Sequence, residues 1–366
     1  MLRSPAVEAP QSDRVVAVVV TYNRREMLLG CLEALAAQTH PVAEVVLVDN
    51  ASTDGTLAHV EAAGVADRLP VRAIRLRRNG GGAEGFHYGV RAAREEQSDW
   101  LWLMDDDCEP RPDALERLLR SGPAADPSAA VLAPVVEDGA GRVLPVNRGH
   151  VRPRWFFAPL VAAPVPERGA APIDFCSFVG PLVRTAVARR IGLPMREMFI
   201  RFEDVEYLSR RGGSESMWLV AESRIVHRDP RPVAGSDLRA MWGDYSQRIP
   251  FDQEWKRLYG VRNQLYCGIR DGYVHAGHAL SQLAVQAVRT VLFGERRVLT
   301  LRLLALYGRD AWRGRFRNVP PARWPELRSA ASPDGFLERE AMNYQEDVSE
   351  PPVPLGSYAP ADARRP

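Results

Sequence analysis

The sequence of 366 residues predicts an α/β fold, with a mixed, mostly parallel sheet flanked by helices and a helical C-terminal extension. Two observations predict the sheet: short runs rich in β-branched residues alternate with stretches of helical periodicity, and polar or glycine-rich motifs directly follow those runs. A third observation predicts the extension, because late in the chain apolar residues recur at positions i, i+3, i+4 and i+7.

The expected elements follow in chain order. Val15–Val20 reads as a strand buried on both faces, and Met27 to Leu35 carries apolar residues at helical spacing. A second buried strand is expected over Glu44–Val48 and a helix after Gly55. The alternation continues with strands over Val71–Arg75 and Trp100–Met104, a helix over 84–96, long loops over 137–172, a strand and then a helix within Phe175–Arg190, an extended segment over Met198–Phe202, a helix from Glu203 and a strand over Trp218–Val226.

These elements predict four parts: a flexible tail over 1–13, an α/β domain over 14–235, a helical region over 236–330, and a Pro-rich, disordered tail over 331–366. In the helical region the apolar residues between Leu280 and Leu292 form one stripe. Residues 289 to 328 contain ten arginines and only three acidic residues. Two interpretations stay open: a core-facing stripe with a solvated arginine face, or a basic amphipathic surface for anionic lipid.

Composition and charge exclude several classes of protein. The 48 basic and 46 acidic residues nearly cancel, so no global field points to nucleic acid, and the composition is not that of a collagen, a disordered chain or a disulfide scaffold. Four scattered cysteines without a CxxC pair favour a reducing, cytoplasmic setting. No signal core and no apolar run of about 18 residues is found, so we expect a protein that crosses no membrane.

The strongest chemical signal is Asp105-Asp106-Asp107, directly after an apolar strand. Three adjacent carboxylates repel each other, and Mg²⁺ or Mn²⁺ would neutralise them while also binding phosphates. The carboxyl end of a strand is also where open α/β sheets bind ligands. A solvated acidic turn is the alternative interpretation.

Three weaker signals accompany the acidic run. Asn79-Gly80-Gly81-Gly82 before a helix allows backbone N–H groups to approach phosphate, although it matches neither a P-loop nor a Rossmann fingerprint. Glu203-Asp204 beside Phe202 offers a general base, or only an acidic helix start. His227 follows a predicted strand and is a ligand for a transition ion, or a structural histidine.

Taken together, the motifs resemble family 2 glycosyltransferases of the GT-A fold. The resemblance covers residues 15 to 230 and rests on motifs in matching order: Val18 to Arg24, Val48 to Thr56, Asn79 to Ala83, Asp105 to Asp107, and Phe202 to Asp204. Within the family the chain is most similar to bacterial galactofuranosyltransferases and rhamnosyltransferases. Glu203-Asp204 replaces a doubled Asp that is frequent there, and paired tryptophans are missing near Phe175 to Pro181, which favours an initiating or single-addition enzyme.

The resemblance implies metal-dependent, inverting transfer from a UDP- or dTDP-sugar, with Mn²⁺ or Mg²⁺ as cofactor. It assigns donor contacts to the segment Thr21, Tyr22, Asn23 and Arg24, to Asp49 for the nucleobase, to Asn79, Gly80 and Gly81 for the diphosphate or sugar, and to Asp105 and Asp106. It assigns the metal to Asp105, Asp107 and His227, and catalysis as the general base to Asp204. Glu203 and Glu206 would orient acceptor or donor hydroxyls.

The acceptor is less specified. A polyprenyl-diphosphate-linked glycan at the cytoplasmic face of the membrane would suit the basic helical region, as peripheral contact, and would connect the chain with cell-envelope polysaccharide synthesis. A soluble acceptor of specialised metabolism is the alternative within the family, and a non-catalytic nucleotide-sugar-binding protein is the alternative outside it. A sugar-1-phosphate nucleotidyltransferase would need a lysine after a Gly-rich loop, and the single lysine is Lys256. The sequence carries no signal for an oligomeric state.

Overall fold

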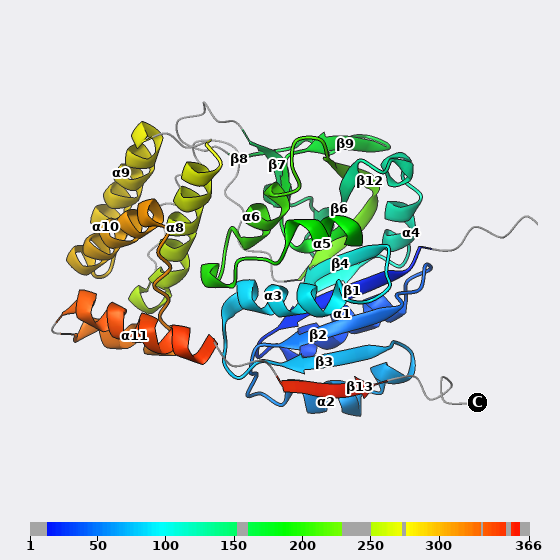
Figure 1. Ribbon diagram of the computed structural model, residues 1–366, viewed down its shortest axis with the longest axis horizontal. Helices are drawn as coiled ribbons and strands as arrows, with labels where there is room; N and C mark the ends of the chain where they lie inside the picture. The colour runs from blue at the N-terminus through cyan, green and yellow to red at the C-terminus, as the bar shows by residue number, and fades with distance from the viewer. Residues whose placement is uncertain are drawn as a thin grey trace, which may run out of the picture.

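The computed structural model describes residues 13–151, 160–228, 250–272, 276–330, 332–348 and 353–358. A curved sheet with helices on both sides forms one part of the molecule, and a group of helices stands beside it (Figure 1). The expected mostly parallel sheet, its flanking helices and the helical C-terminal region are thereby confirmed. The boundary expected near residue 235 lies outside the described residues.

The N-terminal half of the sheet is parallel, in the order β3-β2-β1-β4. Its strands carry Val, Ile, Leu and Trp on both faces because helices cover both sides, as the continuous apolar runs predict. The strands are β1 (Val15–Thr21), β2 (Glu44–Asp49), β3 (Val71–Arg75) and β4 (Trp100–Asp105), and the helices between them are α1 (Arg25–Ala36), α2 (Thr56–Ala62) and α3 (Gly81–Ala93).

The second half of the sheet is mixed. Beyond β4 the order is β11-β6-β12-β5, where only β6 and β12 run parallel, and β9 pairs with β12. The strands are β5 (Cys108–Pro110), β6 (Ala129–Glu137), β9 (Ala170–Ile173), β11 (Val179–Arg184) and β12 (Ser216–His227); the helices are α4 (Ala114–Leu119), α5 (Thr185–Ile191) and α6 (Glu203–Ser209). A small second sheet contains β7 (Arg148–Val151), β8 (Leu160–Ala162) and β10 (Phe175–Cys176).

Helix α3 lies unusually close to β1. A Cβ atom on Gly85 would stand 2.4 Å from Val20 Cγ1, and one on Gly89 would stand 2.4 Å from Val18 Cγ1. Two glycines one helical turn apart thus let the helix backbone reach the strand. This close packing fixes the start of α3 near the carboxyl end of β1.

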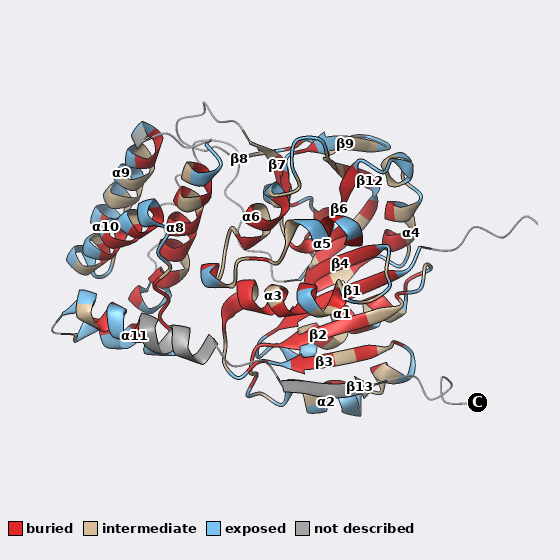
Figure 2. Cartoon of the chain, viewed as in Figure 1, coloured by how far each residue is buried: buried red, intermediate tan, exposed pale blue. Residues whose placement is uncertain are grey.

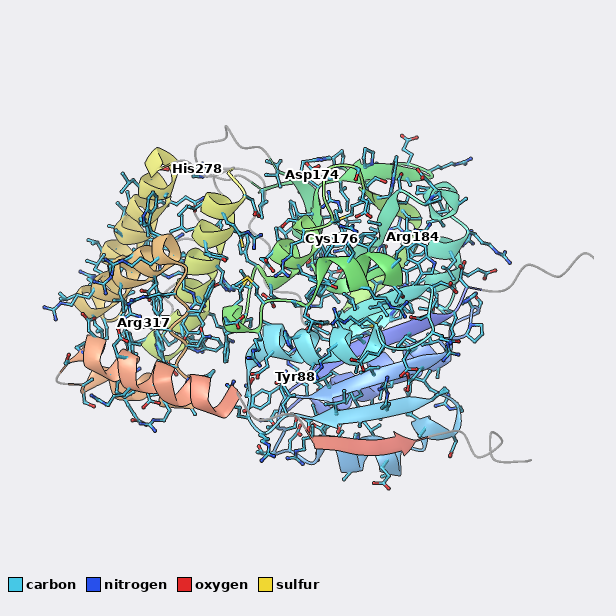
Figure 3. All side chains as sticks on the ribbon, in the orientation of Figure 1. Tyr88, Asp174, Cys176, Arg184, His278 and Arg317 are labelled. Carbon is cyan, nitrogen blue, oxygen red and sulfur yellow. The ribbon has the colours of Figure 1, made fainter. Side chains whose placement is uncertain are left out.

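The helical region has a hydrophobic core of its own. It consists of α8 (Glu254–Arg270), α9 (Ala276–Phe293) and α10 (Arg297–Arg313), which stand together to one side of the sheet (Figure 1). Its large buried apolar side chains include the aromatic residues Phe199, Phe251, Trp255, Tyr259, Tyr307 and Trp324. Arg317, labelled in Figure 3, joins this region to the next helix because it binds Asp310 at 2.6 Å and Glu338 at 2.8 Å.

Three local expectations differ from the structure. The segment expected to be a disordered tail forms α11 (Pro333–Val348) and β13 (Val353–Tyr358), and β13 pairs antiparallel with β3, whose outer edge would otherwise stay unpaired. The loops expected over 137–172 contain β7, β8 and β9. The extended segment expected over Met198–Phe202 is instead a tight turn after a short 3-10 helix, Arg196–Met198, with positive φ at Phe199, Arg201 and Phe202.

Candidate active site

The acidic run lies where β4 meets the end of β1. The backbone N–H of Asp106 donates to the carbonyl of Val20 at 3.1 Å, and the hydroxyl of Thr21 donates to Asp106 Oδ2 at 2.7 Å. These bonds turn Asp106 inward, where it is buried. Asp106 therefore supports the loop through Thr21, and its neighbours on either side, Asp105 and Asp107, are the carboxylates available for other partners.

Two nitrogen-bearing side chains, those of Arg24 and His227, contact Asp107. Arg24 Nη1 donates to Asp107 Oδ2 at 2.7 Å and stands 3.5 Å from Asp106 Oδ1. His227 Nε2 lies 3.2 Å from Asp107 Oδ1, and the backbone N–H of Arg228 donates to the carbonyl of Asp107 at 2.8 Å. The structure thus brings together residues from the ends of β1, β4 and β12 that are far apart in the sequence.

The electrostatics of the three carboxyls are unequal. Burial raises the pKa of Asp105 well above its usual range, and the charges of Asp107, Asp106 and Glu203 raise it further. Burial also raises the pKa of Asp106 to about 6 against the lowering effect of the Thr21 hydrogen bond. Burial acts upward on Asp107 too, but His227 and Arg24 outweigh it and hold the pKa of Asp107 below its ordinary value. A further cation near Asp105 would relieve the remaining repulsion.

The expected nucleotide side is a pair of interlocked loops after β1 and β2. Asn23, at φ 52°, accepts the N–H of Thr53 at 2.7 Å through its side chain, and its own N–H donates to Ser52 Oγ at 2.9 Å. Asp49 is buried and accepts the N–H of Ser52 at 2.9 Å. Tyr22, next to Asn23 in the chain, is partly exposed. The nucleobase contact expected of Tyr22 and Asp49 stays a prediction, and in the structure Asp49 holds the loop.

The glycine motif opens α3 against a second turn. The side chain of Asn79 accepts the N–H of Gly81 at 2.9 Å, and the N–H of Ala83 donates to the carbonyl of Phe199 at 3.1 Å. Gly81 has φ 76°, and a Cβ there would lie 2.1 Å from that carbonyl, so only glycine fits. A Cβ on Gly82 would lie 3.2 Å from Glu203 Oε1, which puts the glycine motif beside the start of α6.

Helix α8 holds the tight turn that precedes α6. The side-chain amide of Asn263 donates to three carbonyls of this turn, those of Met198, Ile200 and Arg201, at 3.0, 3.0 and 2.8 Å. The guanidinium of Arg262, fully buried, donates to Met198 as well, at 3.2 Å. The positive φ values in the turn are costly for side chains larger than glycine, and these hydrogen bonds offset that cost. The helical region therefore shapes the site.

Asp204 lies at the start of α6, half-buried, and accepts the N–H of Val205 at 2.7 Å. Burial raises the pKa of Asp204 to about 6, although backbone N–H groups and the buried guanidinium of Arg148 lower it. Arg148 binds the carbonyls of Pro134 at 3.1 Å and Val179 at 2.6 Å. A carboxyl with a pKa of about 6 is suited to accept a proton near neutral pH.

Glu206 differs from its two neighbours. It is fully buried, and Arg210 binds both of its oxygens, Oε1 at 2.7 Å and Oε2 at 2.5 Å, while Arg270 of α8 binds Oε1 as well. Both oxygens are thus used to join α6 to α8. Glu206 therefore forms structural ion pairs with Arg210 and Arg270, which argues against the orienting role expected of it, and the same role for Glu203, beside the glycine motif, stays a prediction.

The donor set for a metal is partly assembled. Asp107 and His227 are adjacent and offer an oxygen and a nitrogen, a pair that suits Mn²⁺, and the raised pKa of Asp105 marks a carboxylate without full charge compensation. Over the residues that the structure describes, no three His, Cys, Asp or Glu side chains converge as a ready metal cage. Arg24 also binds Asp107, so a metal ion held by Asp107 and His227 would have an arginine close by.

Comparison with known proteins bears on this geometry. The family model for glycosyl transferase family 2 matches residues 16–172. Galactofuranosyltransferase GlfT1 of Mycobacterium tuberculosis is 32% identical over 281 residues, which cover 75% of this chain and 86% of the relative. The chain belongs to glycosyl transferase family 2. GlfT1 of Mycolicibacterium smegmatis is 29% identical over 258 residues, 69% of this chain and 82% of the relative.

The fold agrees with that family. A crystal structure of GalNAc-T7 with UDP, GalNAc and Mn²⁺ superposes with a TM-score of 0.54 over 91% of this chain and 58% of the other, at 13% identity. The resemblance to family 2 glycosyltransferases of the GT-A fold is therefore confirmed, as is the resemblance to galactofuranosyltransferases.

The structure also uses residues that sequence analysis did not single out. Arg148, Arg262 and Asn263 are buried polar side chains that hold the backbone around Asp204 and the turn before α6. Their sequence surroundings are not distinctive, because a buried arginine reads like any other among so many arginines. These hydrogen bonds gather at a turn whose residues have positive φ values, and the local sequence does not predict that turn.

Proposed function

We propose that this family 2 glycosyltransferase is a metal-dependent, inverting enzyme that uses a UDP- or dTDP-sugar. UDP-galactofuranose is the first candidate donor, because the relatives that cover most of the chain are galactofuranosyltransferases. The proposed acceptor is a hydroxyl of a polyprenyl-diphosphate-linked glycan at the inner face of the cell membrane, in cell-envelope polysaccharide synthesis. The observation that carries the proposal is the cluster of Asp105, Asp107, Arg24 and His227, which follow or end β4, β1 and β12 at one edge of the sheet.

Donor binding would follow the interlocked loops. The uracil or thymine ring would lie beside Tyr22 and the loop that Asp49 and Asn23 hold. The diphosphate would extend toward the positive end of α3. There the N–H of Gly81 donates to Asn79 and the N–H of Ala83 to Phe199, so the helix dipole would favour phosphate rather than these two N–H groups. Arg24, already directed at Asp107, would contribute a second positive charge near the diphosphate.

Asp107 and His227, with Asp105, would hold the divalent ion, which would offset the charge of the departing nucleoside diphosphate. Asp204 would take the proton of the acceptor hydroxyl while that oxygen attacks the anomeric carbon. The bond between the anomeric carbon and the donor phosphate oxygen breaks in the same displacement, its electron pair leaves with the diphosphate, and the configuration inverts. Glu203, beside the glycine motif, would orient a sugar hydroxyl.

Calorimetry of UDP and dTDP binding, with and without Mn²⁺, tests the donor site. Asp107→Ala should abolish the metal-dependent part of the affinity, and Asp113→Ala, a change at the surface outside the cluster, is the matched control. If Asp107→Ala leaves the metal-dependent affinity unchanged, Asp107 is not a metal ligand. A thermal-shift series with UDP- and dTDP-sugars then identifies the donor class, because a ligand that binds the native state raises the Tm.

A further inference from the structure

Helix α9 turns its apolar side to solvent. Leu280 is 67% exposed, Val288 58%, and Val291 and Leu292 48% each. With Ala284 and Val285, also exposed, they fall within one continuous arc of the helix that contains no charged residue. We name this set, Leu280, Ala284, Val285, Val288, Val291 and Leu292, the outer face of α9. Figure 2 shows the exposed colour along α9 and α10 at the edge of the molecule.

The inward side of α9 is part apolar and part polar. Ala279 is buried in the core of the helical region, and Leu283 and Ala287 pack against that core. Arg257 of α8 donates to Gln286 Oε1 at 2.8 Å and to Thr290 Oγ1 at 3.0 Å, and His278, labelled in Figure 3, is also buried. A surface helix of a water-soluble protein normally has polar residues on its solvent side, whereas α9 has apolar residues there. The stripe found in the sequence therefore does not face the core as a whole, and its exposed part needs a partner.

Helix α10 adds positive charge beside this outer face. Val298 is 67% and Trp312 65% exposed, and Arg297, Arg302, Arg309 and Arg313 are exposed on the same helix. α9 contains no acidic residue, and the single acidic residue of α10, Asp310, is buried in an ion pair with Arg317. Glu295, between the two helices, accepts the N–H of Phe251 at 2.6 Å and lies 3.8 Å from Arg328. Apolar side chains, a tryptophan and an excess of arginines over acidic residues are the composition of a helix that lies in a membrane interface.

We propose that the outer face of α9, with Val298, Trp312 and the arginines of α10, docks on an anionic lipid bilayer. A second copy of the chain fits less well, because a symmetric contact would set arginines against arginines with no exposed acid of α9 or α10 to pair them. Over the described residues no helix has the length and apolar character to cross a bilayer, so the contact is peripheral. The inference rests on the proposed function in one respect: the proposed lipid-linked acceptor would lie at the same membrane.

The test is sedimentation of the full-length protein with vesicles of phosphatidylcholine, and with vesicles of equal parts phosphatidylcholine and phosphatidylglycerol. Leu280→Ser with Val288→Ser should weaken binding to the anionic vesicles about tenfold or more. Arg302→Gln with Arg309→Gln should weaken it about thirty-fold and reduce the preference for anionic lipid, since each arginine near the surface contributes about a fivefold factor and Arg297 and Arg313 remain. Val146→Ser and Arg68→Gln, exposed positions on the sheet domain, are matched controls and should bind as the natural chain does.

Wild-type binding by both double variants overturns the proposal. So does a lipid-free dimer that Leu280→Ser with Val288→Ser converts to a monomer without any change in vesicle binding, because a second copy then covers the face. The Tm and UDP affinity of each variant, measured without lipid, show that the fold and donor site are intact. If vesicle binding follows the prediction but no nucleotide sugar binds or reacts, the docking face stands and the proposed function fails.

Discussion

Helices α3 and α9 both carry apolar residues at helical spacing, yet they differ in how much of that apolar surface is covered. α3 packs Phe86, Val90 and two glycines into the core of the sheet domain, and its start lies beside Phe199 and Glu203. α9 packs Leu283 and Ala287 toward the core of the helical region and leaves Leu280 and Val288 in solvent. The periodicity of a helix therefore tells which residues share a side, and not how much of that side is covered.

The two regions are nevertheless not independent. Asn263 of α8 holds the turn that leads into α6, where Asp204 lies, and Arg270 of α8 binds Glu206 on the same helix. Under the proposed function, residues of the sheet domain would carry the chemistry, and the helical region keeps the backbone and helix beside Asp204 in place. The predictions below test that division.

The largest effect is expected for Asp204→Asn, because Asp204 is the proposed general base and belongs to the sheet domain. The amide cannot accept the acceptor's proton, so kcat should fall about a thousandfold while UDP affinity stays unchanged. Asp126→Asn, an exposed carboxyl outside the site, is the control and should keep full activity. Near-normal turnover of Asp204→Asn would remove it from the role of base.

The same carboxyl predicts the pH dependence. Burial raises the pKa of Asp204 to about 6, so its basic form is lost as the pH falls through 6, and kcat/KM should drop about tenfold per pH unit below that value. For stability the sign is opposite: the buried carboxyl loses its favourable contribution as the pH rises through about 6. Asp204→Asn should therefore gain Tm relative to the natural chain at pH 8 more than at pH 4. A flat activity profile between pH 4 and 7 would contradict the assignment.

Asn263→Ala tests whether the helical region supports the site. Three carbonyls of the turn lose their donor, which should lower the free energy of unfolding by about 2 kcal/mol and reduce kcat, measured well below the Tm. Gln286→Ala is the matched control, because it also removes an amide hydrogen bond in the helical region, but one without contact to the turn. If both variants keep full kcat, α8 only stabilises the protein.

The smallest effects are expected for a glycine-to-alanine substitution in each helix, which compares how closely α3 and α9 are packed. Gly85→Ala puts a Cβ 2.4 Å from Val20 in α3 and should lower the free energy of unfolding by about 1–3 kcal/mol. Gly277→Ala in α9 meets nothing within 4 Å and should leave it unchanged or raise it by less than about 1 kcal/mol. Urea unfolding measures both. Equal losses would mean that α9 is packed as closely as α3.

The sequence predicted the parts of the molecule where local pattern and burial agree. Val15–Val20 is apolar throughout and lies in a buried parallel strand, and Asp105 to Asp107 follow such a strand to its end, so their place at the sheet edge could be foreseen. His227 and Arg24 meet at Asp107 because parallel strands end at one edge.

Other parts depend on contacts that no local pattern contains. Met198–Phe202 has the composition of a strand, and its turn forms because Arg262 and Asn263, more than sixty positions later, bind its carbonyls. Glu206 resembles Glu203 in sequence, but Arg270 from another region binds it and removes it from the site. The residues after 330 are rich in proline and charge, yet β3 offers an open edge on which β13 can pair.

The last described strand also marks a side of the molecule. β13 lies against β3 along the outer edge of the sheet, on the side of the molecule away from α9 and α10 (Figure 1). A fluorescent label introduced beside this strand would therefore stay clear of the proposed docking face and could report vesicle binding without obstructing it.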